Sequence, residues 1–143
     1  AAASNEGPPQ AVPPLSTIAQ NISEQTWELS SNIYGLSTMR LTCPGGDEAI
    51  LEIGMPDIGG GPMITLQIGL DNVNRFSPGR YGVMTASKGG WVSENRFSAT
   101  MDELGLINLW QWDLVFDGDT VTLSLVSLAG GELPATATGT TAR

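Results

Sequence analysis

Histidine is absent from the sequence, and cysteine and lysine each occur once. Without histidine, the chain lacks a Ser-His-Asp or Cys-His catalytic set and any imidazole ligand for a metal ion. Cys43 has no second cysteine for an internal disulfide bond and no histidine to activate it as a nucleophile. Thr85 stands three residues before Lys88, where a Ser-x-x-Lys hydrolase motif requires serine. The sequence therefore predicts no catalytic residue, no metal site and no cofactor.

Phosphate-binding loops and paired catalytic carboxylates are missing as well. The chain has no Gly-x-x-x-x-Gly-Lys-Ser/Thr loop, and its run of three glycines at 59–61 lies between expected strands and opens no helix. Asp102 and Glu103 are adjacent, so in a strand they point to opposite faces and make a poor acid–base pair. We therefore expect that this chain is not an enzyme.

Positive charge is scarce, with six Lys and Arg against fifteen Asp and Glu, for a net charge of −9. Such a balance repels phosphate backbones and anionic headgroups, so neither nucleic acid nor a membrane surface is expected as a partner. No apolar run approaches the roughly 18–20 residues that span a bilayer. The first residues lack the charged start and apolar core of a signal peptide.

The first 14 residues contain four of the nine prolines and show no apolar periodicity. This composition is typical of an extended linker, and we expect residues 15–143 to form a single β-barrel domain. The domain is expected to begin with a short helix at residues 15–24, where Ile18 and Ile22 are four apart and Ser16 can cap the first turn.

The strongest pattern lies in residues 91–126. Residues 96–102 and 120–125 alternate between apolar and polar side chains, and residues 107–116 lie between them. The Asp117-Gly118 pair stands where the chain must reverse, which is the usual signal of a β-hairpin. The pattern indicates an antiparallel β meander.

Gly- and Pro-rich turns separate further short segments along the chain, including a turn expected at residues 88–90. The remaining strands are expected at residues 26–29, 36–43, 48–54, 63–70, 74–77, 81–85, 90–93 and 135–140. This spacing is typical of an all-β barrel or sandwich. Lysines often protect the exposed edge strands of open sheets, and this chain has only one, whereas a closed barrel has no exposed edge. We therefore predict an antiparallel barrel of about eight strands.

Four large side chains are candidates for lining a ligand pocket. Trp110 and Trp112 are two residues apart and share one face of a strand, while Met101 and Trp27 are expected on the inner faces of other strands. These side chains can line a cavity for a small apolar ligand. They can equally fill the interior of a small barrel. The sequence leaves both interpretations open.

Several segments together resemble a known domain. They are Asn32-Ile33-Tyr34-Gly35-Leu36, Asp71-x-Val73-x-Arg75-Phe76-Ser77-Pro78-Gly79, Gly90-Trp91-x-x-Glu94-Asn95-x-Phe97 and Asp102-Glu103-x-Gly105-x-Ile107-Asn108. Residues 15–141 resemble the C-terminal lipocalin-like β domain of some serine hydrolases that are related to β-lactamases and penicillin-binding proteins. The catalytic motifs of those proteins have no match in this sequence.

The resemblance implies a non-catalytic accessory domain whose partner is the catalytic domain of the same parent polypeptide. The Gly-rich loop at residues 57–62 is then the expected contact that shapes access to the active site. The same resemblance implies a periplasmic or extracellular location. The alternative is a free-standing lipocalin-like protein that binds a small apolar ligand.

Overall fold

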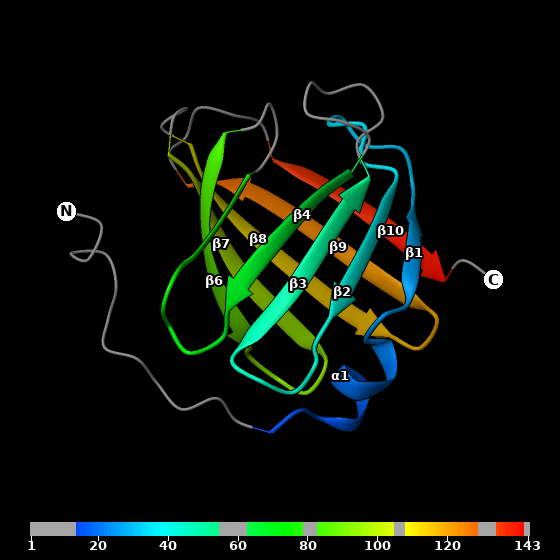
Figure 1. Cartoon of the computed structure of the whole chain (residues 1–143). Coiled ribbons are helices and arrows are strands. Elements are labelled where there is room, and N and C mark those ends of the chain that lie inside the picture. The colour runs from blue at the N-terminus through cyan, green and yellow to red at the C-terminus, as the bar shows by residue number, and fades with distance from the viewer. Residues whose placement is uncertain (1–13, 55–62, 79–82, 105–107, 129–133, 142–143) are drawn as a thin grey trace.

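The computed structural model describes residues 14–54, 63–78, 83–104, 108–128 and 134–141 (Figure 1). Within these ranges the chain forms one short helix and ten strands. They are α1 (Thr17–Ile22), β1 (Thr26–Leu29), β2 (Thr38–Thr42), β3 (Glu48–Gly54), β4 (Met63–Gly69), β5 (Arg75–Pro78), β6 (Met84–Trp91), β7 (Arg96–Glu103), β8 (Asn108–Asp117), β9 (Thr120–Ser127) and β10 (Ala135–Thr141).

The strands form one sheet in the order β4-β3-β2-β1-β10-β9-β8-β7-β6-β5. Neighbours in this order pair antiparallel, and β4 closes the barrel by meeting β6 at the parallel pair Gly69 and Lys88. At the same seam, the backbone N–H of Gln67 on β4 donates a 2.9 Å hydrogen bond to Oγ of Ser77 on β5. The predicted all-β antiparallel barrel with a short N-terminal helix is confirmed, with ten strands in place of about eight.

Alternation along each strand sorts the side chains between core and surface. On β8, Trp110, Trp112, Leu114 and Phe116 are each at most 2% exposed, whereas the residues between them are more accessible. The inward faces of β1–β4 and β7–β10 supply the core in the same way, with Trp27, Met39, Leu41, Leu51, Ile53, Ile68, Phe97, Val121 and Leu123 all nearly inaccessible. No helix in the described ranges is long and apolar enough to cross a membrane.

The hairpin between β8 and β9 turns where the sequence predicts. Asp117 pairs with Thr120, and Gly118 between them has a φ of +60°, a backbone conformation that favours glycine. The three strands expected between residues 96 and 125 therefore correspond to β7, β8 and β9.

The prediction for β6 was wrong. We expected strands at 81–85 and 90–93 with a turn at 88–90, but one strand runs through these glycines from Met84 to Trp91. Gly89 pairs with Ala99 on β7, and a Cβ on Gly89 would overlap the carbonyl oxygen of Ser98. The glycine permits a close approach between two strands rather than a reversal of the chain.

The helix α1 covers one end of the barrel, which is called the helix end below (Figure 1). Oγ of Ser16 accepts a 3.1 Å hydrogen bond from the backbone N–H of Ala19, as the predicted cap requires, and donates one of 2.7 Å to the carbonyl of Glu94. Ala19 and Ile22 are buried against the barrel. The linker expected at residues 1–14 lies outside the described residues apart from Pro14.

A charged cluster ties the seam together near the helix end. Nε of Arg75, on β5, lies 2.6 Å from Oε1 of Glu48 on β3, and Nη1 lies 3.1 Å from Oδ1 of Asp71. Nη1 also donates a 2.8 Å hydrogen bond to the carbonyl of Val73. The hydrogen bond from Arg75 lowers the pKa of Asp71, and the same contact raises the pKa of Arg75. Arg75 thereby links β5 to β3 across the seam, where β4 and β5 do not pair as a ladder.

Candidate functional site

A buried carboxylate lies inside the barrel. Glu103 continues the inward face of β7, in phase with Phe97, Ala99 and Met101, and it is 1% exposed. Nε1 of Trp110 on β8 donates a 2.7 Å hydrogen bond to Oε1 of Glu103. A carboxylate so buried is costly unless hydrogen bonds stabilise it.

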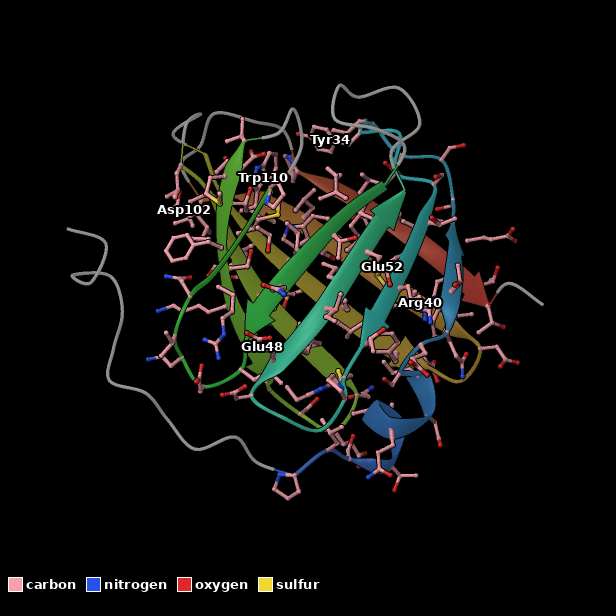
Figure 2. All side chains as sticks on the ribbon, in the orientation of Figure 1. Tyr34, Arg40, Glu48, Glu52, Asp102 and Trp110 are labelled. Carbon is pink, nitrogen blue, oxygen red and sulfur yellow. The ribbon has the colours of Figure 1, made fainter. Side chains whose placement is uncertain are left out.

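The site lies toward the end of the barrel opposite α1, where Figure 2 labels Tyr34 and Trp110. This end is called the Trp110 end below. The ring of Tyr34, in the segment between β1 and β2, meets the ring of Trp110 edge to face with 5.5 Å between centroids. Asp102 precedes Glu103 in the chain but points away from the barrel, as Figure 2 shows. The adjacent carboxylates therefore lie on opposite faces of β7, as expected.

Strand register places small hydroxyl groups beside this pair. Ser87 on β6 is opposite Met101, Met101 is opposite Trp110, and Trp110 is opposite Ser127 on β9. These four residues form one row across the inner face of the sheet. Glu103 stands two residues from Met101 on β7, so Ser87 and Trp110 are its diagonal neighbours.

Several polar atoms of this interior have no hydrogen-bond partner among the described residues. They are Oγ of Ser87, Oγ of Ser127, Nε1 of Trp112 and Nε1 of Trp27. Each is buried, and leaving such a group unsatisfied costs about 1–3 kcal/mol. The interior is thus mostly apolar, and a few of its hydrogen-bonding groups make no hydrogen bond to the described residues.

The structure brings together three of the four residues predicted to line a pocket. Met101 on β7 is directly opposite Trp110 on β8, and Trp112 lies two residues further along the same inner face of β8. Trp27 lies apart in a second aromatic group, 5.6 Å from the ring of Phe116, which in turn lies 5.7 Å from the ring of Trp91. Trp27 is 0% exposed, and Trp110 and Trp112 are each 2% exposed, whereas Met101 is partly exposed.

Sequence reasoning missed several buried polar residues of the interior, among them Glu103, Ser87 and Ser127. Glu103 was weighed as one of two adjacent carboxylates, although its phase with Phe97 and Met101 already marked it as inward-facing. Ser87 was hidden by the wrong turn prediction in β6, and Ser127 lies just past the predicted end of β9.

Cys43 packs in the hydrophobic core beside the inward-facing residues of β2. Its side chain is 5% exposed. Burial raises the pKa of the Cys43 thiol, and the neighbouring Trp91 indole offsets part of that rise. A thiol with a raised pKa is a poor nucleophile near neutral pH.

Two hollows open on the surface of the described part of the chain, and Pro14 and Leu15 line both of them. One is about 360 Å³ and reaches Leu70, Lys88 and Trp91, and the other is about 740 Å³ and lies between α1 and the turn that follows β2. Neither is lined by Glu103 or Trp110. Within the described ranges, no group of three or more Cys, Asp or Glu side chains is arranged to hold a metal ion.

The sequence matches no protein-family model and no curated protein. The fold, however, is similar to solved structures. The fatty acid binding protein of Schistosoma mansoni in complex with arachidonic acid has a TM-score of 0.66 and 13% identity, over 88% of this chain and 99% of that chain. Apo lipid binding protein 8 of Caenorhabditis elegans has a TM-score of 0.64 and 8% identity, over 90% and 99%. The fatty-acid-binding protein of Manduca sexta has a TM-score of 0.61 and 13% identity, over 83% of this chain and 98% of that chain.

These structures correct the resemblance derived from the sequence. The prediction of a C-terminal β domain of a β-lactamase-related serine hydrolase was wrong, because the similar barrels are free-standing proteins matched over almost their whole length. The function of an accessory domain is contradicted with it, and a catalytic domain as partner has no support. The loop at 57–62, expected to contact such a domain, lies outside the described residues.

The physical reason for the error is visible in the segments that carried it. Gly35 has a φ of +67° and Asn72 has a φ of +67°, so these residues mark reversals of the chain. Trp91 and Phe97 face inward on β6 and β7. Turn residues and inward aromatics recur in antiparallel barrels of every kind, and they therefore do not identify a family.

Proposed function

We propose that this chain is a non-catalytic binding protein that holds a small apolar ligand inside its barrel. The observation that carries the proposal is the set of buried polar atoms without partners: Ser87 Oγ, Ser127 Oγ, Trp112 Nε1 and Trp27 Nε1. A ligand with one polar end and an apolar body would satisfy some of these atoms and bury its body against the core. The likeness to barrels described as fatty-acid-binding proteins supports the same function.

The proposed pocket is lined by Trp110, Trp112 and Met101, with Trp27 at its far end. Ligand sites of this kind combine large apolar walls with a few placed hydrogen-bonding groups. Met101 is the least buried of the four, and its unbranched thioether can adopt several rotamers to admit a ligand.

Access is proposed from the Trp110 end. Tyr34 and Met101 are partly exposed there. The opposite end is covered by α1, and Arg75 ties the strands together beside it. A ligand that enters past Tyr34 would meet the polar groups near Glu103 first.

The extent of the functional unit is part of the proposal. We take residues 15–143 as a single binding domain and residues 1–14 as a linker that takes no part in binding. The chain carries no histidine and no Ser-x-x-Lys motif, so the proposal includes no catalytic step.

Titration of the delipidated protein with Nile red, a neutral dye whose emission rises in apolar surroundings, tests this function. We expect a saturable increase at one dye per chain, together with a change in tryptophan emission. Met101→Trp would fill the proposed pocket and abolish saturable binding. Thr122→Trp adds the same ring to the exposed outer face of β9 and should leave binding unchanged. Emission that rises only linearly with dye, or equal binding by both variants, would contradict the proposal.

A further inference from the structure

Trp110 and Trp112 lie two residues apart on the inner face of β8, and each is 2% exposed. Their indole groups differ in one respect. Nε1 of Trp110 donates a 2.7 Å hydrogen bond to Glu103, whereas Nε1 of Trp112 has no partner among the described residues. An indole N–H can donate a hydrogen bond but cannot accept one, so the N–H of Trp112 calls for an acceptor.

The strand register explains why the surrounding side chains supply no acceptor to Trp112. Ala99 on β7 and Leu125 on β9 are directly opposite Trp112, and Gly89 on β6 is opposite Ala99. None of these three residues has a polar side-chain atom, and neither does Leu114, the next inward residue of β8. A buried donor without an acceptor is costly, so an acceptor brought by a ligand would stabilise this part of the interior.

A trapped water molecule fits this position less well than a ligand oxygen does. A buried water typically makes about three hydrogen bonds to polar groups around it. The inward-facing residues diagonal to Trp112 on β7 and β9 are Phe97, Met101, Leu123 and Ser127. Of these four, Ser127 alone has a hydroxyl group. An oxygen atom within a ligand needs no such set of partners, because the rest of the ligand holds it in place.

The spacing along β8 indicates where on the ligand this oxygen lies. The row that contains Trp110 also contains the serine hydroxyls that can bind the polar end of a ligand. Trp112 lies two residues further along the strand, which is about 7 Å, or about six bonds of an extended chain. The next inward row holds Phe97, Leu114 and Leu123, whose side chains have no hydrogen-bond donor.

We infer that the ligand is an amphiphile with a second oxygen acceptor inside its apolar chain, about six bonds from its polar end, and that Nε1 of Trp112 donates to this oxygen. The chemical class is a chain interrupted by an ether, ester or keto group rather than an unbroken hydrocarbon chain. This inference rests on the proposed function and names the ligand class of the same site.

Displacement of bound Nile red by two isomeric ether alcohols tests the inference. The ether oxygen of 5-(heptyloxy)pentan-1-ol can reach the row of Trp112, whereas that of 10-propoxydecan-1-ol would lie beside Leu114. The isomers have the same length and the same atoms, so their general hydrophobicity is matched. We expect the first to displace the dye at a concentration about tenfold lower, because its oxygen gains a hydrogen bond that the other oxygen lacks. Equal competition, or tighter binding of 10-propoxydecan-1-ol, would overturn the inference.

Trp112→Phe is the variant that removes the donor and keeps a ring at the same position. In this variant the ratio between the two isomers should fall from about tenfold to about one. Trp91→Phe makes the same substitution at the helix end, outside the proposed pocket, and should keep the ratio of the wild type. A folded Trp112→Phe protein that still prefers 5-(heptyloxy)pentan-1-ol would show that Trp112 does not bind the chain oxygen.

The indole N–H resonances of the ¹⁵N-labelled protein give a readout that does not depend on the dye. The resonance missing from the spectrum of Trp112→Phe identifies Trp112, and it should move downfield on addition of 5-(heptyloxy)pentan-1-ol but not of its isomer. An identical response to both isomers would contradict the inference. If Trp112→Phe does not fold, the ratio measured on the wild type still decides.

The outcomes also separate the inference from the proposed function. If Nile red shows no saturable binding and neither isomer changes the tryptophan emission, the proposed function fails and the inference fails with it. If the dye binds and both isomers displace it equally, the binding function stands and the chain oxygen is refuted.

Discussion

Arg75 Nε and Glu48 Oε1 are 2.6 Å apart, although β5 and β3 are not hydrogen-bonded neighbours in the sheet. β4 lies between these strands in the chain, and it is joined to β5 by the Gln67–Ser77 hydrogen bond rather than by a ladder. The side chain of Arg75, 18% exposed, is therefore a cross-link over the seam where β4 and β5 do not pair as a ladder.

Removal of this cross-link should destabilise the protein. Arg75→Gln leaves the carboxylates of Glu48 and Asp71 without their cation, and we expect a loss of about 2 kcal/mol in the free energy of unfolding, measured by urea denaturation. Arg96→Gln is the control, since Arg96 pairs with Asp113 at 3.2 Å but is 51% exposed. That change should cost less than about 1 kcal/mol. Equal losses for both variants would show that the contacts of Arg75 stabilise the protein no more than an exposed ion pair does.

Stability should also fall in acid through Asp71. The pKa of Asp71 in the folded protein lies below its ordinary value, mainly because of the hydrogen bond from Arg75. Ionised Asp71 therefore contributes stability that is fully present above the unfolded pKa of about 4 and is lost as the pH falls through the folded pKa. Urea midpoints between pH 7 and pH 2.5 should decline less steeply for Asp71→Asn. An identical acid dependence in both proteins would show that Asp71 does not contribute to the loss of stability in acid.

The same substitution at two tryptophans separates a hydrogen bond from packing. Trp110→Phe and Trp112→Phe each shorten a buried ring by a similar volume, but Trp110 donates to Glu103 whereas Nε1 of Trp112 has no partner among the described residues. We expect Trp110→Phe to cost about 1–3 kcal/mol more than Trp112→Phe, because Glu103 loses a buried donor. Thermal or urea unfolding measures the difference, and a larger loss at Trp112 would refute this assignment.

Replacement of the two glycines of β6 by alanine should change the stability to different extents. A Cβ on Gly89 would overlap backbone atoms of Ser98 and Ala99, whereas a Cβ on Gly90 meets nothing within 4 Å. Gly89→Ala should cost about 1–3 kcal/mol through overpacking against β7. Gly90→Ala should be neutral to within about 0.5 kcal/mol or slightly stabilising. Two equal effects in an unfolding series would mean that β6 and β7 do not approach as closely as described.

The part of the fold that the sequence predicts is the part where alternation is long and the turn is marked. Strands β7 to β9 follow from period-two alternation and from Asp117-Gly118. Strand β6 was predicted wrongly because two adjacent glycines are typical of a turn in a sequence. In the structure Gly89 instead permits the close approach of β7. Propensity cannot reveal such a contact between strands.

The sequence predicted where some of the apolar side chains of the candidate site lie, whereas their role in binding a ligand stays a prediction. Trp110, Trp112 and Met101 could be assigned to one surface from spacing, and β7 and β8 do bring them together. The polar half depended on how strands align, since Ser87 and Ser127 join the row through pairings with Met101 and Trp110 that no local pattern specifies.

The pairing of β1 with β10 has a consequence for how the chain folds as it is made. Trp27 pairs with Thr141, so β1 gains one of its two neighbours only after synthesis has reached Thr141. Until β10 arrives, the facing edges of β1 and β9 are both open, and contacts of such large sequence separation form slowly. A chain shortened before residue 135 would keep these edges unpaired, and we expect it to associate with other copies through them.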